Sequence, residues 1–587
     1  MSVLPRLTRP RATRSTQPWW LRAATGVQGA VSRPGVLVAT SLYLGYTIWL
    51  AWPMPIHLST TLWGPGGDVL GLLSTWREIA QHTFPFLPGR ISSLAYPGGL
   101  PVDYAFNITT SPSSTIYWLA TLAFGALPAM NLFVVAGFAA TGVAVFLLIR
   151  GLTGDPWAAL ICGWGLTFQR DALFNAVTAP DFMHRWALAA LVWRALVLQR
   201  EPTKRNGLLA GAAALLAVSW NPYYLLMGTV AFATLTVVNL ALAAKRRMFL
   251  RQLRAHAVAL AVLGVAAVGY AVVTAVSATS GIRTHSLQDL QLYSARPLEY
   301  LMPPPNHVLL RGHQFDWPLA RPGTNFYIGL SLVFLAAIAI VRAFRRSTPR
   351  HERDAVISLS ALGAVALVWS GPPIAPIGRF DFKLPSYYVF QLTSTWRIYG
   401  RFGIVVGFAV CILAGFGLAA LLRSRQGITR VALILVASVV VFVDVKSPTY
   451  PITTYAEPSI YRVLRKQPPG AVAEYPLVAA TLGAYDQVFR QDYHGRPILN
   501  GYYSGSPAEA RALSLARLDD PATPRRLASL GIRYVVLNTT AGYYGPPGAA
   551  GHPTRQFRRI AAADGFELYV IACAVSARDA HEAQCPA

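Results

Sequence analysis

Carboxylates are sparse among the long apolar stretches of this sequence, and the most isolated of them is Asp68. It stands in GPGGDVLGLLSTWREIAQHTF (residues 64–84), directly after a glycine pair and before an apolar run. The glycines permit unusual backbone dihedrals and a close approach of other segments. A carboxylate at a helix start accepts a backbone N–H as a cap, which lowers its pKa and keeps it ionised. A general base must also be ionised, so the position suits a cap, a base or both.

Three further acids are candidates for a second carboxylate or a polar contact to substrate. Asp181 in TAPDFMHRW precedes an apolar stretch and has His184 within one turn, so it is either an N-cap or a catalytic acid. Asp103 in YPGGLPVDY is explained equally well by turn chemistry. Asp171 follows Arg170, with which it would form a simple surface pair.

Two arginines and two tyrosines complete the set of residues that could bind a substrate. Arg397 and Arg401 in STWRIYGRFG are four residues apart, which would place both on one side of a helix. Two guanidiniums suit a phosphate or pyrophosphate, although extension towards lipid headgroups would also explain them. Tyr223 and Tyr224 in WNPYY belong either to an aromatic belt at a membrane interface or to a surface on which a sugar stacks.

The elements that must position these residues are membrane helices. Of the 587 residues, 54% are hydrophobic and only 13% are charged, against about 25% charged in soluble domains. Apolar stretches of the length that crosses a bilayer recur along the chain. We expect about eleven transmembrane helices, over residues 36–53, 128–149, 156–170, 183–199, 207–220, 223–243, 255–277, 326–342, 355–371, 402–422 and 428–445.

The net charge of +26 is explained by orientation in the membrane and requires no nucleic acid. Lys and Arg cluster in short segments between the apolar spans, within residues 6–33, 204–205, 245–254, 342–353 and 423–430. The positive-inside rule places such segments in the cytoplasm. With eleven spans, this predicts a basic cytoplasmic tail (residues 1–35), a cytoplasmic N-terminus and an extracytoplasmic C-terminus in a multi-pass protein of the cytoplasmic membrane.

The extracytoplasmic face is predicted to carry a long first loop and a C-terminal domain. The loop (residues 54–127) follows the first span of the transmembrane domain (residues 36–445) and includes a helical pattern over 68–84 that suits a helix along the membrane interface. Residues 446–587 contain short β-type runs at 470–477 and 532–538 and a helical run at 506–518, which predict a small α/β domain. A disulfide between Cys573 and Cys585 would suit an extracytoplasmic tail.

Sequence motifs narrow the class of function further. The chain has no Walker loop, zinc signature or GxSxG, and no series of acids within the spans that would form a proton relay. An energised pump or an ion-coupled transporter is therefore disfavoured.

Several segments, taken in order, resemble a known group of proteins. They are GGDVLGLLSTW (66–76), AYPGGLPVDY (95–104), TWRIYGRFGIVVGFAV (395–410), VLRKQPPGAVAEYPL (463–477), HGRPILNGYYSG (494–505) and LASLGIRYVVLN (527–538). Together with the long outer loop that has an acid near its start, they resemble the GT-C superfamily of integral-membrane glycosyltransferases. Within it, the chain is most similar to bacterial YfhO-like membrane proteins.

The resemblance implies a transfer of sugar from a polyprenyl-phosphate carrier to a cell-envelope glycan, lipid or protein, by an inverting reaction. By position, Asp68 would be the general base and Asp181 or Asp171 the second acid. Arg397 and Arg401 would hold the phosphate. His184, Asp103, Tyr223 and Tyr224 would contact the substrate.

No cofactor is required by the sequence, although a divalent cation beside Asp68 is compatible with it. The Ala-, Arg-, Gly- and Pro-rich composition is typical of high-GC organisms such as actinobacteria. Two other functions remain open at this point: a lipid or glycan transporter or flippase, and a non-catalytic scaffold for envelope assembly.

Overall fold

The computed structural model describes residues 33–82, 90–101, 112–277, 285–304, 307–308, 326–377, 379–393, 396–447, 449–478, 484–502, 506–540 and 550–572. Most of the predicted basic tail lies outside these ranges, as do Asp103, Cys573, Cys585 and the side chain of Asp68. The expectations for those residues stay predictions.

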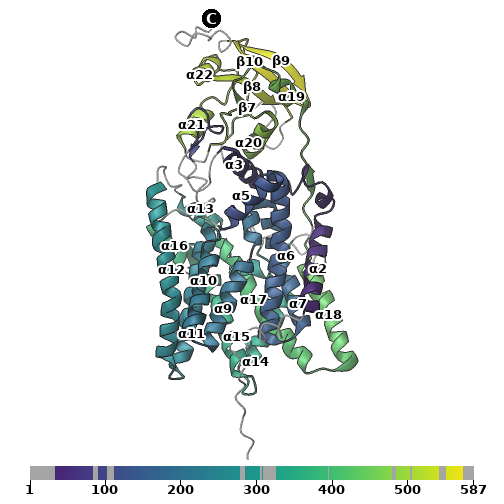
Figure 1. Ribbon diagram of the computed structural model, residues 1–587, viewed down its shortest axis with the longest axis vertical. Coiled ribbons are helices and arrows are strands. Elements are labelled where there is room, and N and C mark those ends of the chain that lie inside the picture. The colour runs from purple at the N-terminus through teal and green to yellow at the C-terminus, as the bar shows by residue number, and fades with distance from the viewer. Residues whose placement is uncertain are drawn as a thin grey trace, which may run out of the picture.

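Eleven helices of the described chain overlap the eleven predicted spans and stand side by side as a bundle (Figure 1). They are α2 (Arg33–Leu50), α6 (Ala126–Thr153), α7 (Pro156–Thr167), α9 (Trp186–Arg200), α10 (Lys204–Val218), α11 (Pro222–Ala244), α12 (Phe249–Ser277), α14 (Leu330–Ala343), α15 (Arg350–Ser370), α17 (Gly403–Arg423) and α18 (Gly427–Val445).

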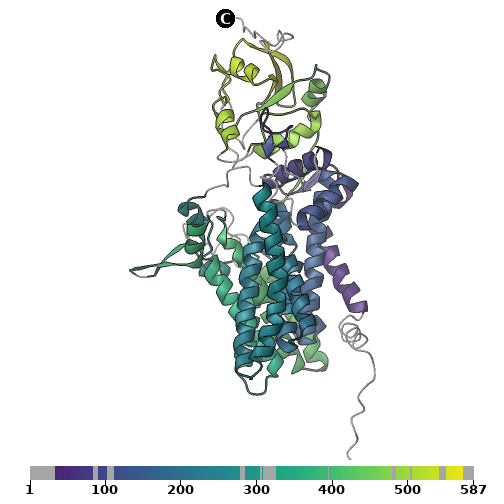
Figure 2. The same ribbon diagram turned by 60° about the vertical axis from the view of Figure 1, so that its left-hand side comes forward.

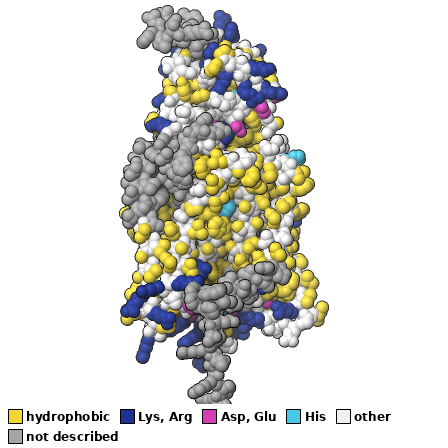
Figure 3. Space-filling model, in the orientation of Figure 1, with side chains coloured by type: hydrophobic (Ala, Val, Ile, Leu, Met, Phe, Trp, Pro, Cys, Tyr) yellow, Lys and Arg dark blue, Asp and Glu magenta, His cyan; other side chains and the backbone are white. Residues whose placement is uncertain are grey.

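Five of these helices are long and apolar enough to cross a membrane: α6, α11, α15, α17 with its preceding turn, and α18. Two shorter apolar helices lie within residues 35–50 and 330–343. Helix α17 is the most buried of the five, and α14, α15 and α7 pack around it. In the space-filling view, hydrophobic side chains dominate the visible face of the bundle, as expected for a surface in contact with lipid (Figure 3).

The two ends of the bundle differ in charge. We call the end that carries the C-terminal domain the domain end and the opposite end the far end (Figure 1). In Figure 3, Lys and Arg gather at the far end of the bundle and also on the C-terminal domain, with few on the hydrophobic surface between them. Three acids at the far end pair with arginines: Arg423–Glu352 (2.6 Å), Arg430–Asp155 (2.9 Å) and Arg246–Asp354 (2.5 Å).

The segment between α2 and α6 folds over the domain end. It contains β1 (Thr61–Trp63), α3 (Asp68–His82), the paired strands β2 (Arg90–Ile91) and β3 (Leu100–Pro101), and α5 (Pro112–Phe124). The apolar face expected for α3 is present, because Val69, Leu73, Trp76 and Ile79 are buried. Its environment differs from the expected membrane interface, since α3 packs against α5 and α6 on one side and against α20 (Ala484–His494) of the C-terminal domain on another.

A short connection between α15 and α17 extends sideways near the domain end. It consists of β4 (Ile374–Ile377), β5 (Phe380–Lys383) and α16 (Pro385–Leu392). Strands β4 and β5 pair as an antiparallel hairpin, which projects from the side of the bundle in Figure 2.

The C-terminal domain is built on a four-stranded sheet in the order β7-β8-β10-β9. Strands β7 (Ala471–Tyr475) and β8 (Ile532–Asn538) are parallel and occur where the sequence predicts them, whereas β10 (Phe566–Ile571) runs antiparallel to β8 and β9 (Phe557–Ala563). The helices are α19 (Ser459–Arg465), α20, α21 (Pro507–Leu513) and α22 (Thr523–Ser529). The domain is therefore of mixed α/β structure.

Two features attach this domain to the first loop. Strand β1 pairs with β6 (Ile452–Thr454), the strand that follows α18. Gly66 has a φ of +94°, and a Cβ there would lie 2.4 Å from the Tyr455 hydroxyl. Only glycine permits both this backbone conformation and this close approach. The loop that carries Asp68 is thus fixed by the segment entering the C-terminal domain.

The close packing of α17 against α14 yields a stability prediction. A Cβ at Gly417 would lie 1.9 Å from the backbone oxygen of Leu335. We expect Gly417→Ala to cost about 1–3 kcal/mol or more by forcing the helices apart, measured as a lower thermal unfolding midpoint in detergent. Gly45→Ala is the matched control, since nothing lies within 4 Å of a Cβ there. Equal midpoints for the two variants would contradict the packing.

Candidate functional site

Three segments that the sequence singled out meet at the domain end of the bundle. The first is η2 (Pro180–Met183), between α8 (Arg170–Thr178) and α9. The second is the start of α11, where Asn221 caps the helix and Pro222 occupies its first position. The third is η4 (Tyr399–Phe402), the turn that leads into α17. Each is a helix end, so polar side chains project there without interrupting an apolar span.

Asp181 lies in η2, and its carboxylate contacts the start of α11. The Asn221 amide donates to Oδ2 of Asp181 at 2.8 Å, and the Trp220 indole donates to its backbone oxygen at 3.0 Å. The predicted cap of the next helix does not form, because α9 begins only at Trp186. Burial raises the pKa of Asp181 to about 6, and the charge of Arg401 opposes that rise. A carboxylate with a pKa near neutrality is suited to proton transfer.

The guanidinium of Arg401 is stacked between two aromatic rings. Its Cζ lies 4.1 Å from the ring centroid of Phe182 and 4.2 Å from that of Tyr223. Such contacts hold a guanidinium in place without using its N–H donors. Arg401 forms no hydrogen bond or ion pair with any residue that the structure describes. Its donors are therefore available to an anionic ligand.

Arg397 does not share a helix face with Arg401, contrary to the expected spacing. Residues 396–398 are not helical, and η4 begins only at Tyr399. The reason is that this segment bonds to neighbouring elements: the Trp396 indole donates to the oxygen of Pro222 at 3.1 Å. The Arg397 guanidinium instead lies over the ring of Tyr293, 5.1 Å from its centroid, next to α13 (Leu287–Leu292).

His184 and Tyr224 have structural roles in place of the expected substrate contacts. The Trp186 indole donates to Nδ1 of His184 at 3.1 Å, so Nε2 carries the proton and donates to the Phe133 oxygen at 3.1 Å. Tyr224 is fully buried, and its hydroxyl donates to the oxygen of Phe182 at 3.4 Å. Tyr223 is the member of the tyrosine pair that contacts Arg401.

Asp68 is the first residue of α3, and the backbone places its loop near that of Asp181. Gly64 lies so close to Val177 that a Cβ on Gly64 would be 2.5 Å from the Val177 Cβ. Gly64 precedes Asp68 by four residues, and Val177 precedes Asp181 by four. Gly66 and Gly67 both adopt the positive φ that the sequence predicts for this turn. The cap and base roles of Asp68 both remain predictions, because they depend on its side chain.

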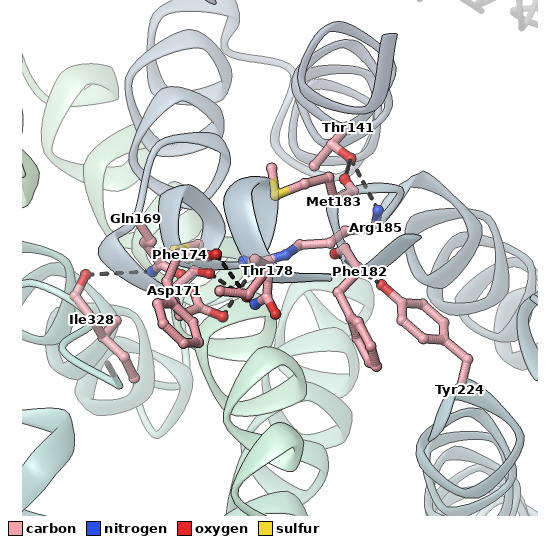
Figure 4. A network of polar contacts seen from close by, with 12 residues as sticks. Thr141, Gln169, Asp171, Phe174, Thr178, Phe182, Met183, Arg185, Tyr224 and Ile328 are labelled. Atoms are coloured by element: carbon pink, nitrogen blue, oxygen red, sulfur yellow. Dashed lines mark hydrogen bonds and ion pairs between the residues drawn. The ribbon is translucent and has the colours of Figure 1, made fainter. Parts of the chain in front are cut away.

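A buried ion pair fixes the loop that carries Asp181. Arg185 is fully buried and donates through Nη2 to the Asp171 carboxylate at 2.7 Å, while its backbone N–H donates to Oγ1 of Thr141 on α6 at 3.0 Å (Figure 4). Asp171 was expected to form a simple surface pair with the adjacent Arg170. The structure instead joins it to a residue fourteen positions away, which ties α8 to the start of α9.

Sequence reasoning missed two residues of the site, Asn221 and Phe182. Asn221 holds Asp181 with its amide while its Oδ1 accepts the backbone N–H of Tyr224 at 2.8 Å. The Asn-Pro pair at an expected helix start is a recognisable capping signal, which the aromatic residues of WNPYY obscured. Phe182 has no comparable signal, since its role depends on the position of Arg401, more than 200 residues away.

Metal binding has no candidate in the described part of the chain. No group of three or more His, Cys, Asp or Glu side chains there could hold an ion. Because the side chains of Asp68 and Asp103 lie outside the described set, the divalent cation stays a prediction.

The Asp171–Arg185 pair yields a second stability prediction. Asp171→Ala leaves a buried guanidinium uncompensated, which costs about 3–5 kcal/mol, so thermal unfolding in detergent should occur at a clearly lower temperature. Replacing both residues, as Asp171→Ala with Arg185→Leu, should recover part of the loss. Asp381→Ala, at an exposed position of β5, is the control. Full stability of the single variant Asp171→Ala would exclude a structural role for the pair.

Several solved structures match the chain. The arabinofuranosyltransferase AftD from Mycobacteria matches with a TM-score of 0.57 and 15% identity, over 92% of this chain and 40% of that one. This chain thus spans about two fifths of the length of AftD. An Archaeoglobus fulgidus oligosaccharyltransferase matches with a TM-score of 0.47 and 12% identity, over 88% of this chain and 70% of that one. ArnT from Cupriavidus metallidurans, bound to undecaprenyl phosphate, matches with a TM-score of 0.40 and 14% identity, over 93% and 99%.

The sequence comparisons identify a family. No curated protein sequence matches the chain. Residues 41–446, more than half of its length, match the model described as Domain of unknown function (DUF6311). Among the solved structures, the likeness to AftD establishes the fold alone. The chain belongs to the DUF6311 family, and its fold is similar to that of AftD.

Proposed function

We propose that this protein is a membrane glycosyltransferase that moves a sugar from a polyprenyl-phosphate carrier to a glycan, lipid or protein of the cell envelope. The observation that supports this proposal most strongly is the position of Arg401. Its guanidinium is held between the rings of Phe182 and Tyr223, interacts electrostatically with Asp181, and has no hydrogen-bond partner in the described chain. An immobilised cation with free N–H donors is what binding and stabilising a phosphate require.

The proposed reaction forms a bond between an acceptor hydroxyl oxygen and the anomeric carbon of the donor. The bond between that carbon and the phosphate oxygen breaks, and the polyprenyl phosphate leaves with one additional negative charge. Arg401 stabilises this charge through its free N–H donors, and Arg397 assists from the side of α13. The hydroxyl proton passes to a carboxylate. Attack opposite the leaving group inverts the anomeric configuration.

We assign the general base to Asp68 and a binding role to Asp181. The start of α3 and the η2 turn are brought together by the contact of Gly64 with Val177. Asp181 is held by Asn221 and interacts electrostatically with Arg401. In the described part of the chain, the Asp181 carboxylate forms no ion pair, so it stays available to bind the substrate. Asp103 and Tyr223 would contact the sugar, and a divalent cation would bind beside Asp68 if one is used.

In this proposal the domain end of the bundle is extracytoplasmic and the far end is cytoplasmic. The gathering of Lys and Arg at the far end supports this orientation. The prenyl chain would lie against the apolar sides of the bundle. The C-terminal domain would then bind the acceptor glycan in the extracytoplasmic space.

The test is transfer by the purified protein from labelled polyprenyl-phosphate sugars. We expect Asp68→Asn to lower kcat by about 10²–10⁴-fold, since loss of a general base costs that much. Arg401→Gln should lower kcat/KM by a similar order, since removing one donor to the developing charge costs about 10²–10³-fold. Asp381→Asn, at an exposed position outside the site, should retain full activity. Full activity of the Asp68 and Arg401 variants in a folded protein would refute the proposal.

The pKa of Asp181 gives a pH prediction. Because burial raises it to about 6, the ionised form is lost as the pH falls through about 6, and kcat/KM should decline there. The positive charge of Arg401 lowers this pKa. Removing the charge in Arg401→Gln should therefore move the acid limb of the residual activity to higher pH.

Arg397→Gln is the control for that experiment, because the guanidinium of Arg397 lies over Tyr293 and acts on Asp289. Its acid limb should stay at the wild-type position. A limb that shifts equally in both arginine variants would mean that Asp181 is not the group that titrates.

A further inference from the structure

A cavity with four cationic residues in its wall lies at the far end of the bundle, remote from the candidate site. Its volume is about 780 Å³, and it is bounded by the start of α10, the turn between α11 and α12, and the first turns of α12. The wall consists of Lys204, Arg247, Arg251 and Arg254 together with Pro202, Met248, Phe249, Leu250 and Ala255. No acid contributes to it.

These cations form no ion pair with any acid that the structure describes. Arg251 donates through Nε to the oxygen of Pro202 at 3.3 Å, which fixes one side of the cavity. Lys204, Arg247 and Arg254 form no hydrogen bond or ion pair with the described residues. Two acids at this end, Asp354 and Glu201, lie outside the cavity wall.

Neither of these two acids supplies a counter-charge within the cavity wall. Asp354 pairs with Arg246, which is outside the cavity wall. Glu201 acts on Arg200 and also does not contribute to the wall. A cavity with four cations and no counter-charge is electrostatically complementary to an anion.

The apolar part of the cavity wall indicates which kind of anion would bind there. Leu250 is 65% exposed, and Met248 and Phe249 are also exposed. Along α12, the surface continues with exposed Leu253 and Leu260 towards the middle of the bundle. A cationic cavity that opens onto an apolar helix face matches a molecule with an anionic head and hydrocarbon chains.

We propose that this cavity binds an anionic phospholipid of the membrane leaflet at the far end. The phosphate of the headgroup accepts hydrogen bonds from Arg247, Arg251 and Arg254, as guanidiniums and phosphate do in bidentate pairs. The acyl chains lie along the exposed leucines of α12. The volume is within the range of small-molecule sites. The site is independent of the proposed glycosyl transfer, because it lies at the opposite end of the bundle.

The positive-inside rule alone would account for cations at this end. It does not require that they surround a cavity, and it predicts the same lipid response for any exposed cation at the far end. Arg346, between α14 and α15, is such a cation: it is exposed and is not part of the cavity wall. It therefore supplies a matched control.

The experiment titrates the purified full chain in detergent with phosphatidylglycerol, phosphatidylcholine or inorganic phosphate and follows the thermal unfolding midpoint. We expect phosphatidylglycerol to raise the midpoint and the other two to leave it nearly unchanged. In the double variant Arg247→Asn with Arg254→Gln, the apparent affinity for phosphatidylglycerol should fall roughly twenty-five-fold, at about fivefold for each cation lost near an anionic lipid. Asn suits position 247 because Arg247 has a φ of +58°.

Arg346→Gln should respond to phosphatidylglycerol as the wild type does. Lys204→Glu, at an exposed position at the start of α10, keeps the test informative if the double variant fails to fold, and it should also weaken the response. Native mass spectrometry should show a phosphatidylglycerol bound to the wild type and lost from these cavity variants. Equal responses of the cavity variants and Arg346→Gln would overturn the proposal, as would a response to inorganic phosphate that equals the response to lipid.

Discussion

The buried ion pair between Arg185 and Asp171 is the interaction on which the geometry of the candidate site depends. A guanidinium without exposure to solvent requires a counter-charge, since an unpaired buried charge is very costly. Arg185 therefore holds Asp171 on α8 and, through its backbone, Thr141 on α6 (Figure 4). Asp181 is only four residues before Arg185, so fixing Arg185 also fixes η2. The position of Asp181 thus depends on the buried charge of Arg185, which need not contact a substrate.

A second constraint acts from the C-terminal domain. Helix α3 buries Val69, Leu73 and Trp76 in a core that also contains residues of α5, α6 and the sheet of that domain. The apolar face of α3 is consequently covered by both parts of the chain, and the pairing of β1 with β6 reinforces the attachment. Asp68 at the start of α3 is therefore positioned by the membrane helices and the C-terminal domain together. In the proposed reaction, a movement of the C-terminal domain would therefore shift Asp68, the general base.

The sequence predicts the bundle well because hydropathy depends on local composition. Each expected span overlaps a helix, and the parallel strands β7 and β8 occur at the expected positions. Contacts between segments that are distant in the sequence could not be predicted from it. The spacing of Arg397 and Arg401 indicated one helix face, but bonds from Trp396 and Gly400 to other elements keep the first arginine out of the helix. Likewise, an apolar face on α3 is predictable, whereas its partner in the C-terminal domain is not.

Charged side chains that have no partner in the described chain mark the candidate ligand-binding sites of this protein. At the far end, Asp155, Glu352 and Asp354 are each paired with an arginine, which suits a purely structural role. Arg401 at the domain end and the cations of the far-end cavity differ, since aromatic rings or cavity walls hold them while their donors stay free in the described chain. Such an arrangement is consistent with a ligand that supplies the missing counter-charge, and both proposed ligands carry a phosphate beside a long hydrocarbon chain.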